Sequence, residues 1–339
     1  MLARNLLLAS GDQQIFLAVA HDTSPFITAY PWSDAGFGTK FTNPGTLPAT
    51  TGVGVAFSPD CTAIAVAHLA SSPYVTAYPW SPSGFGTKFA NPGTLPAAAA
   101  YAVAFAPMSN AIAVAGTASP YLEAYPWSGS GFGSKFSNPG TLPAVSNAQC
   151  VAFSPAGDAV IRGYEAYAWS GSGFGSKFSN PGTLPTGQQT GVAFSPAGDA
   201  VAISHAITPF VSAYPWSGSG FGSKFTNPAT LPVSTGHDVA FSPDGAAIAV
   251  AHDTSPFVSV YAWSGSGFGS KFSDPGTLPA TNATGVAFAP NGASIAVSHG
   301  ATSPRVSAYP WSPSGFGSKF TNPGTLPTGH AYAVAFGII

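Results

Sequence analysis

Charged residues are scarce in this chain of 339 residues. Only 6% are Asp, Glu, Lys or Arg, against about 25% in an ordinary globular domain, and the formal net charge is −2. A chain of this charge has no electrostatic attraction toward nucleic acid or an anionic membrane. We therefore expect no nucleic-acid partner, and a surface kept in water by Ser, Thr, Asn and backbone groups.

Cysteines and long apolar runs are also few. Two cysteines, Cys61 and Cys150, do not make a disulfide framework, and we expect buried thiols. No apolar run approaches the ~18 residues of a membrane span, so no span is predicted. The short run Leu6 to Ala9 falls below the about 7–15 residues of a secretory signal, and no signal peptide is expected.

Glycine and proline are abundant instead, and they recur at fixed places. The chain has 40 Gly and 33 Pro. The seven tryptophans follow one another at intervals of 42 to 48 residues: Trp32, Trp80, Trp127, Trp169, Trp216, Trp263 and Trp311. Each lysine stands eight residues after a Trp: Lys40, Lys88, Lys135, Lys177, Lys224, Lys271 and Lys319. One unit is therefore repeated seven times.

The unit that begins at Gly236 contains four short strands. Gly236 to Phe241 ends in a Ser-Pro-Asp-Gly turn, and Ala246 to His252 alternates Ala with Ile and Val. Phe257 to Trp263 and Phe268 to Phe272 follow after further turns. Four strands in about 47 residues, with no helical stretch, predict an all-β, seven-bladed β-propeller with four antiparallel strands per blade. Residues 1–339 are expected to form this one propeller, with 1–12 as an N-terminal segment.

The repeat resembles the WD40 type. The resemblance rests on Val-Ala-Phe-Ser-Pro-Asp-Gly, on the preceding Gly236-His237, and on the Trp that closes the third strand. It implies a propeller fold over almost the whole chain. Each Trp is followed by Ser and not Asp, however, and Gly-His recurs only at Gly329-His330, so the hydrogen-bonded network of that family cannot form in most blades. The tail Gly-Phe-Gly-(Ser/Thr)-Lys-Phe-x-Asn-Pro is similar to repeats of uncharacterised propellers encoded by tailed phages.

The ends of the chain suggest how the ring closes. The chain opens on a second strand, Ile15 to His21, and closes on an unaccompanied first strand, residues 331–336. We expect this last strand to complete the first blade, which removes an open sheet edge. In a competing interpretation, Leu6 to Ala9 fill that place and 331–336 remain free to pair with a neighbour's sheet.

Two repeated side chains are candidate sites. The seven lysines could form a cationic ring that grips an anionic glycan or a partner, or they could protect outer strand edges from pairing. Histidines end the second strand in five blades: His21, His68, His205, His252 and His299. Equivalent positions are spread around a ring, so we expect structural hydrogen bonds in place of a metal site. Neither a metal nor a cofactor is expected.

The fourth blade differs from the others. Its Trp lies 42 residues after the preceding one, where the other intervals are 47 or 48, and the hairpin near Val160 is shortened. Glu123, Arg162 and Glu165 replace the common residues of this region and of the blade before it. They are the candidate contact with a partner; the alternative is a drifted repeat with an exposed ion pair.

No catalytic constellation is visible, so the sequence predicts a protein that is not an enzyme. The favoured function is a structural or adhesion propeller of a phage virion or other extracellular surface, whose partners are proteins of an assembly or surface glycans. The alternative is a multivalent lectin-like glycan-binding module, and the third is an intracellular WD40-type protein scaffold. The expected location is extracellular or on a virion surface.

Overall fold

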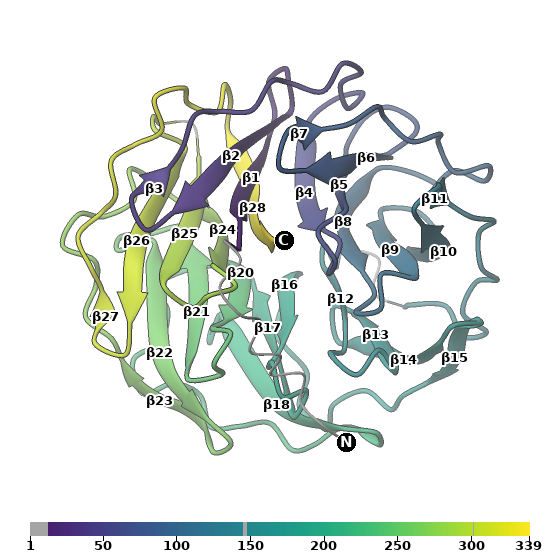
Figure 1. The fold of residues 1–339 in the computed structure, drawn as a ribbon. Coiled ribbons are helices and arrows are strands. Elements are labelled where there is room, and N and C mark those ends of the chain that lie inside the picture. Colours follow the sequence, from purple (N-terminus) through teal and green to yellow (C-terminus); the bar gives the residue numbers. More distant parts are fainter. Residues whose placement is uncertain (1–12, 145–147, 301) are drawn as a thin grey trace.

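Seven four-stranded antiparallel sheets surround a central axis (Figure 1). The computed structural model describes residues 13–144, 148–300 and 302–339. Within these residues all regular structure is β-strand, and no helix that could cross a membrane is present. The predicted fold class, a seven-bladed propeller, is confirmed. We number the blades 1 to 7 by the chain order of their third strands.

Each blade runs from an inner strand at the axis to a short outer strand. The inner strands are β28 (Ala331–Ile338), β4 (Gly52–Phe57), β8 (Ala100–Phe105), β12 (Val151–Phe153), β16 (Gln189–Phe194), β20 (Gly236–Phe241) and β24 (Ala283–Phe288). The second strands are β1 (Ile15–His21), β5 (Ala63–His68), β9 (Ala111–Gly116), β13 (Ala159–Arg162), β17 (Ala200–His205), β21 (Ala247–His252) and β25 (Ser294–His299). The third strands are β2 (Ile27–Ser33), β6 (Val75–Ser81), β10 (Leu122–Ser128), β14 (Glu165–Ser170), β18 (Val211–Ser217), β22 (Val258–Ser264) and β26 (Val306–Ser312). The outer strands are β3 (Gly36–Phe37), β7 (Gly84–Phe85), β11 (Gly131–Phe132), β15 (Gly173–Lys177), β19 (Gly220–Phe221), β23 (Gly267–Lys271) and β27 (Gly315–Phe316).

The C-terminal strand closes the ring, as the sequence predicts. β28 pairs antiparallel with β1 in a register that joins Val19 to Val334 and Ile15 to Ile338, and blade 1 has the strand order β28-β1-β2-β3. Figure 1 shows β1 and β28 side by side near the axis. The competing segment Leu6 to Ala9, within the N-terminal residues 1–12, lies outside the described residues.

The alternation in the second strands explains how one blade packs on the next. All six residues of β21 are buried, because a propeller sheet is covered on both faces. Its small residues, such as Ala249, pack with Ile295 and Val297 of blade 7. Its large residues, Ile248 and Val250, pack with small residues of blade 5. Small side chains of one blade therefore meet large side chains of its neighbour, which gives dense packing all around the ring.

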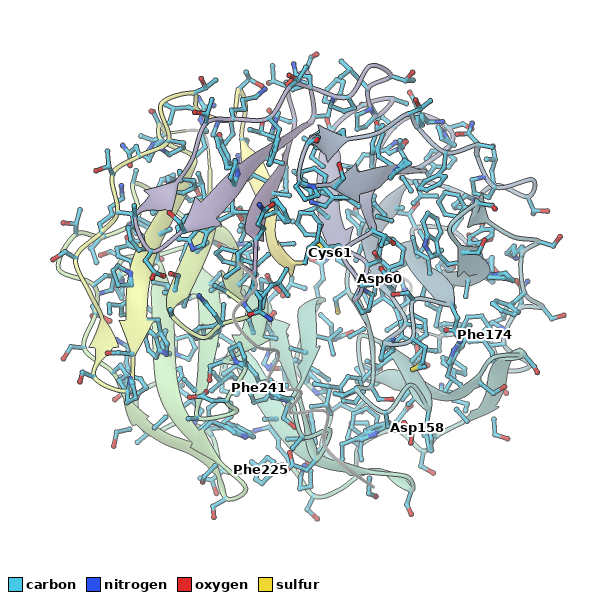
Figure 2. The ribbon with its side chains drawn as sticks, in the orientation of Figure 1. Asp60, Cys61, Asp158, Phe174, Phe225 and Phe241 are labelled. Atoms are coloured by element: carbon cyan, nitrogen blue, oxygen red, sulfur yellow. The ribbon has the colours of Figure 1, made fainter. Side chains whose placement is uncertain are left out.

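Each tryptophan joins two blades through phenylalanine rings. Trp263 lies edge-on to Phe268 of its own outer strand, with centroids 5.1 Å apart, and to Phe241 of its inner strand, also at 5.1 Å. A third ring, Phe225, comes from the preceding blade at 5.4 Å. Figure 2 shows Phe241 nearer the ring centre and Phe225 further out. The recurring Gly-Phe-Gly-Ser-Lys-Phe tail therefore supplies one ring to its own blade and one to the next.

A glycine makes this aromatic contact possible. Gly267 has φ +98°, and a Cβ there would lie 3.0 Å from the ring of Phe225. Only glycine adopts that conformation at no steric cost. The outer strands are shorter than the sequence suggests: five of the seven span two residues, whereas β15 and β23 span five.

Removing one tryptophan should destabilise the ring measurably. We expect Trp263→Ala to lower the free energy of unfolding by about 3–5 kcal/mol, the usual cost of deleting a buried aromatic side chain. Urea denaturation followed by circular dichroism measures this change. Leu184→Ala is the control, because Leu184 is 45% exposed, and it should change stability by less than about 0.5 kcal/mol. Equal effects of the two changes would contradict the packing described here.

Candidate functional site

A pocket lies on the ring axis, where the first halves of the inner strands converge. Its volume is about 470 Å³, within the range of small-molecule sites. All seven blades contribute to its lining. A ligand in this pocket would therefore contact segments far apart in the sequence.

One residue of each blade is aimed into this pocket from the same place in the repeat. It stands two residues before the Val of Val-Ala-Phe, and in six blades it is the extra residue of a β-bulge between the first and second strands. Bulges re-aim a side chain and are frequent next to active sites. We call these residues the bulge column; they are Val53, Tyr101, Gln149, Thr190, His237, Thr284 and Tyr332.

The bulge column is the signal that the sequence reasoning missed. The Val two positions later is the same in every blade, whereas the column itself holds five different residue types. In a chain of near-identical repeats, a position that varies so close to the constant Val-Ala-Phe segment indicates that the copies are used differently. Aligning the seven units on Val-Ala-Phe would have found this position without a structure.

His237 lines the pocket and pairs with Asp253, which lies outside the lining. His237 Nε2 lies 2.6 Å from Oδ1 of Asp253, which stands in the hairpin between β21 and β22. A carboxylate that accepts the Nε2 proton fixes the imidazole tautomer and leaves Nδ1 able to accept another proton. The pair thus has the arrangement of a general base held by an orienting carboxylate.

Asp238 follows His237 and ties two blades together. Its Oδ1 accepts from the backbone N–H of Val239 at 2.9 Å, and its Oδ2 accepts from that of Val286, in β24 of the next blade, at 3.0 Å. Burial raises the pKa of Asp238 to about 6, and the two backbone donors oppose that shift. Gly191, in the preceding blade, leaves room for this carboxylate, since a Cβ there would lie 2.8 Å from Oδ1.

Blades 7 and 1 continue the polar wall. Asn282 of blade 7 accepts a hydrogen bond on Oδ1 from Thr281 Oγ1 at 3.1 Å, an arrangement in which the amide nitrogen can donate to a ligand. His330 of blade 1 stacks on Tyr332 with ring centroids 4.5 Å apart, and its backbone N–H donates to Asp22 Oδ1 at 3.0 Å. Burial lowers the pKa of His330, and the Asp22 carboxylate acts in the opposite direction.

The wall across the ring is apolar. Blades 2 and 3 stand opposite blade 6 in a ring of seven (Figure 1), and they contribute Val53, Leu69 and Tyr101 to the pocket. Leu69 holds the place that Asp22 and Asp253 hold in their own blades, directly after the histidine that ends the second strand. The pocket is therefore polar on one side and apolar on the other.

The repeated histidines have the structural role that the sequence predicts. In each of the five blades, Nε2 shares a hydrogen bond of 2.9 to 3.1 Å with a Thr or Ser hydroxyl of the third strand. All five imidazoles are fully buried. His21 Nδ1 also donates to the Thr23 carbonyl oxygen at 2.8 Å. These rings hold their own hairpins together and are distinct from His237 and His330.

The seven lysines are half-buried at the periphery of the blades. Six of them bond the Asn or Asp three residues further on, as Lys88 bonds Asn91 and Lys271 bonds Asp274. Lys177 instead pairs with Glu165 at 2.5 Å. Only Lys177 and Lys271 fall within outer strands. Edge protection by the seven lysines and a cationic ring that grips an anionic glycan or a partner both stay predictions.

Glu123, Arg162 and Glu165 lie in the interior, where we expected an exposed contact. Glu123 accepts from the Ala97 backbone N–H at 2.9 Å and pairs with Lys135 at 3.3 Å. Arg162 donates to the Gly116 carbonyl oxygen at 3.2 Å and lies over the Tyr121 ring at 5.4 Å. Their exposed fractions are 4% or less. A partner could not touch these side chains directly, so the structure gives them internal contacts; docking of a partner above them stays a prediction.

Solved structures with the same fold are numerous, although no family model and no curated protein matches this chain. A candidate 6-phosphogluconolactonase of Bacteroides fragilis is similar with a TM-score of 0.76 and 12% identity, over 97% of this chain and 99% of that chain. A periplasmic gluconolactonase of Pseudomonas aeruginosa is similar with a TM-score of 0.69 and 14% identity, over 95% and 99%. At such identities the likeness shows the propeller fold.

These neighbours contradict our functional prediction. Their names are those of enzymes, whereas we expected a non-catalytic structural or adhesion component, and the phage likeness finds no support among them. The reason for the error is physical. The pocket is lined by single residues from the inner strands of all seven blades. Such a site leaves no nucleophile or carboxylate motif within one segment of the sequence. The predicted virion surface is likewise unsupported; the periplasmic name belongs to the neighbour.

Proposed function

We propose that this protein is a hydrolase that opens lactones, which are cyclic esters, in the axial pocket. The observation that carries the proposal is the His237–Asp253 pair in a pocket where the bulge column brings seven side chains together. The names of the structural neighbours support the same reaction class. A site argument of this kind is needed because one propeller fold serves many functions.

The reaction requires a base for water and a donor for the developing oxyanion. Nδ1 of His237 takes a proton from water as the water oxygen attacks the lactone carbonyl carbon. The ring C–O bond then breaks, and the ring oxygen leaves with a proton returned by the imidazole. The product is the open hydroxy acid, so lactone and water are consumed one to one. Asp253 holds His237 in the required tautomer and stabilises its protonated form.

The neighbouring blades offer the oxyanion donors. Asn282 of blade 7, next to blade 6, and Tyr332 of blade 1, one blade further on, line the pocket. Each carries an N–H or O–H group that can donate to the carbonyl oxygen. Fixed donors of this kind are effective because they need no reorganisation as charge develops. Asp238 touches neither water nor lactone in this scheme. It fixes β20 against β24 through its two backbone hydrogen bonds and so positions His237 relative to Asn282.

His237→Ala should abolish most of the activity. Loss of a general base typically costs about 10²- to 10⁴-fold in rate, and we expect kcat for a δ-lactone to fall by that factor. A pH-indicator assay of lactone opening, corrected for the spontaneous reaction, measures the change. The melting temperature should stay within a few degrees of the wild-type value, because His237 is half-buried and makes its hydrogen bond at the surface.

Asp253→Asn tests the role of the carboxylate. It should lower kcat with little effect on KM, because Asp253 acts through His237. Asp34→Asn is the matched control; Asp34 is exposed in the turn between β2 and β3, away from the pocket, and its loss should leave both constants unchanged. Retention of full activity by both His237→Ala and Asp253→Asn would refute the proposed base.

A further inference from the structure

We propose that the lactone taken by this pocket carries no phosphate and bears an apolar substituent, which lies on the wall formed by Val53, Leu69 and Tyr101. This inference rests on the proposed function and names the substrate class of the same site. It separates this chain from neighbours whose name includes a phosphorylated sugar lactone.

The first support is the charge of the pocket. Among the described residues that line it, none is Lys or Arg, and the ionisable acid is Asp238. Two further carboxylates, Asp22 and Asp253, bond directly to lining residues. Arg305 is close enough to His330 to act on its charge, but it does not line the pocket. A phosphate ester carries a charge of about −1.5 to −2 at neutral pH, so it would meet carboxylates without a Lys or Arg in the lining to pair with.

The second support is the choice of residue at equivalent positions. The position after the second-strand histidine is Asp in blades 1 and 6 but Leu69 in blade 2. The bulge column holds His237 in blade 6 and Val53 in blade 2. Blade 2 therefore has apolar residues at both positions where blade 6 has its His–Asp pair. This exchange gives the pocket two walls of opposite character.

The third support is the position of these walls. Blade 2 and blade 3 lie across the ring from blade 6, and Tyr101 of blade 3 extends the apolar wall. A lactone whose carbonyl faces His237 then directs its ring substituent toward Val53 and Leu69. Water displaced from this wall by a hydrocarbon arm contributes binding free energy, whereas a polyhydroxylated arm would lose hydrogen bonds there.

The experiment compares five substrates on the intact protein. They are δ-valerolactone without a substituent, its propyl and pentyl derivatives, D-glucono-δ-lactone and the 6-phosphate of that lactone. Burial of each methylene should raise kcat/KM about fourfold where contact is complete. We therefore expect the pentyl lactone to exceed the unsubstituted one by about tenfold or more, and the phosphorylated lactone to be the poorest of the five.

Leu69→Asp places in blade 2 the residue that blades 1 and 6 already accept. It should remove the preference for the pentyl lactone over δ-valerolactone. Leu142→Asp is the matched control, since Leu142 is exposed and does not line the pocket; this variant should keep the preference. Binding of pentyl and unsubstituted δ-valerolactam, measured by calorimetry, reports the same preference without turnover.

The outcomes separate this inference from the proposed function. Faster opening of either glucono-lactone than of the pentyl lactone overturns the substrate class but leaves the lactonase intact. Absence of any lactone opening, with tighter binding of the pentyl lactam that Leu69→Asp removes, overturns the reaction but supports the apolar wall. Equal binding of the two lactams and no turnover overturns both.

Discussion

Acidification from pH 7 to pH 5 should destabilise the propeller by several kcal/mol. The cause lies in five buried histidines, His21, His68, His205, His252 and His299. Burial lowers the pKa of each from 6.5 to about 4. Between these two values the unfolded chain binds protons that the folded chain does not bind.

The sign of this effect follows from proton linkage. A lowered histidine pKa stabilises the folded state above pH 6.5, and that contribution is lost as the pH falls toward 4. At pH 5 each histidine costs about 2 kcal/mol, since one pKa unit corresponds to about 1.4 kcal/mol. Asp238, whose pKa is raised to about 6, opposes the loss because its folded state binds a proton more tightly. The net loss of about 8 kcal/mol is comparable to the whole stability of a typical domain.

Urea denaturation at pH values from 8 to 5 measures this dependence. The slope of unfolding free energy against pH should approach about three to four protons near pH 5.5, because Asp238 offsets part of the five histidines. His205→Gln should reduce that slope by about one proton and make the variant less stable than wild type at pH 8, because the bond to Ser212 at 3.0 Å is weakened. A slope of one proton or less in the wild-type protein would contradict the neutral, buried state of these rings.

Removing the closing strand should prevent the ring from folding. A chain that ends at His330 lacks β28, which pairs with the whole of β1. Trp32 would lose its edge contact with Phe336 at 5.3 Å, and Val334 would leave the core shared by blades 1 and 7. The β1 edge, with every residue buried in the closed ring, would face water and invite aggregation.

The test measures whether the truncated chain still unfolds cooperatively and elutes as a monomer; we expect both properties to be lost. A synthetic peptide of residues 328–339 should restore both by adding its strand to β1. Ile339→Ser serves as the control, since it changes an exposed terminal side chain and should leave unfolding nearly unchanged. A truncated chain that melts like the full protein would show that β28 is not needed for closure.

The fold was predictable because its causes are repeated in the sequence. Trp263 and each equivalent Trp contact phenylalanines of two blades, so Trp and Phe recur at the same places in every unit. The closing role of 331–336 was predictable from the phase of the repeat, since these residues match the first strand of the unit and Ile15 to His21 match the second. Strand ends were less accurate, because the outer strand in five blades stops after two residues. These five blades have Pro in the third strand, which has no N–H for the sheet ladder, whereas β15 and β23 lie beside Ala168 and Ala262.

The site was not predicted because its residues are separated by whole blades. His237 in β20 and Asp253 in the β21–β22 hairpin are 16 residues apart, and Asn282 and Tyr332 belong to other units. Blade 4 drew attention through its shortened hairpin, yet that hairpin places Arg162 inside, over Tyr121. Departures from a repeat therefore have two causes, internal repacking and ligand contact, and burial is needed to distinguish them.

The most direct test of the proposed activity is the initial rate of lactone opening by the wild-type protein at pH 7.5, measured against the spontaneous rate. We predict saturation with substrate concentration and competitive inhibition by the matching lactam, which has the same ring but resists hydrolysis. A rate that equals the spontaneous reaction for every lactone, at protein concentrations where the fold is intact, would contradict catalysis in the axial pocket.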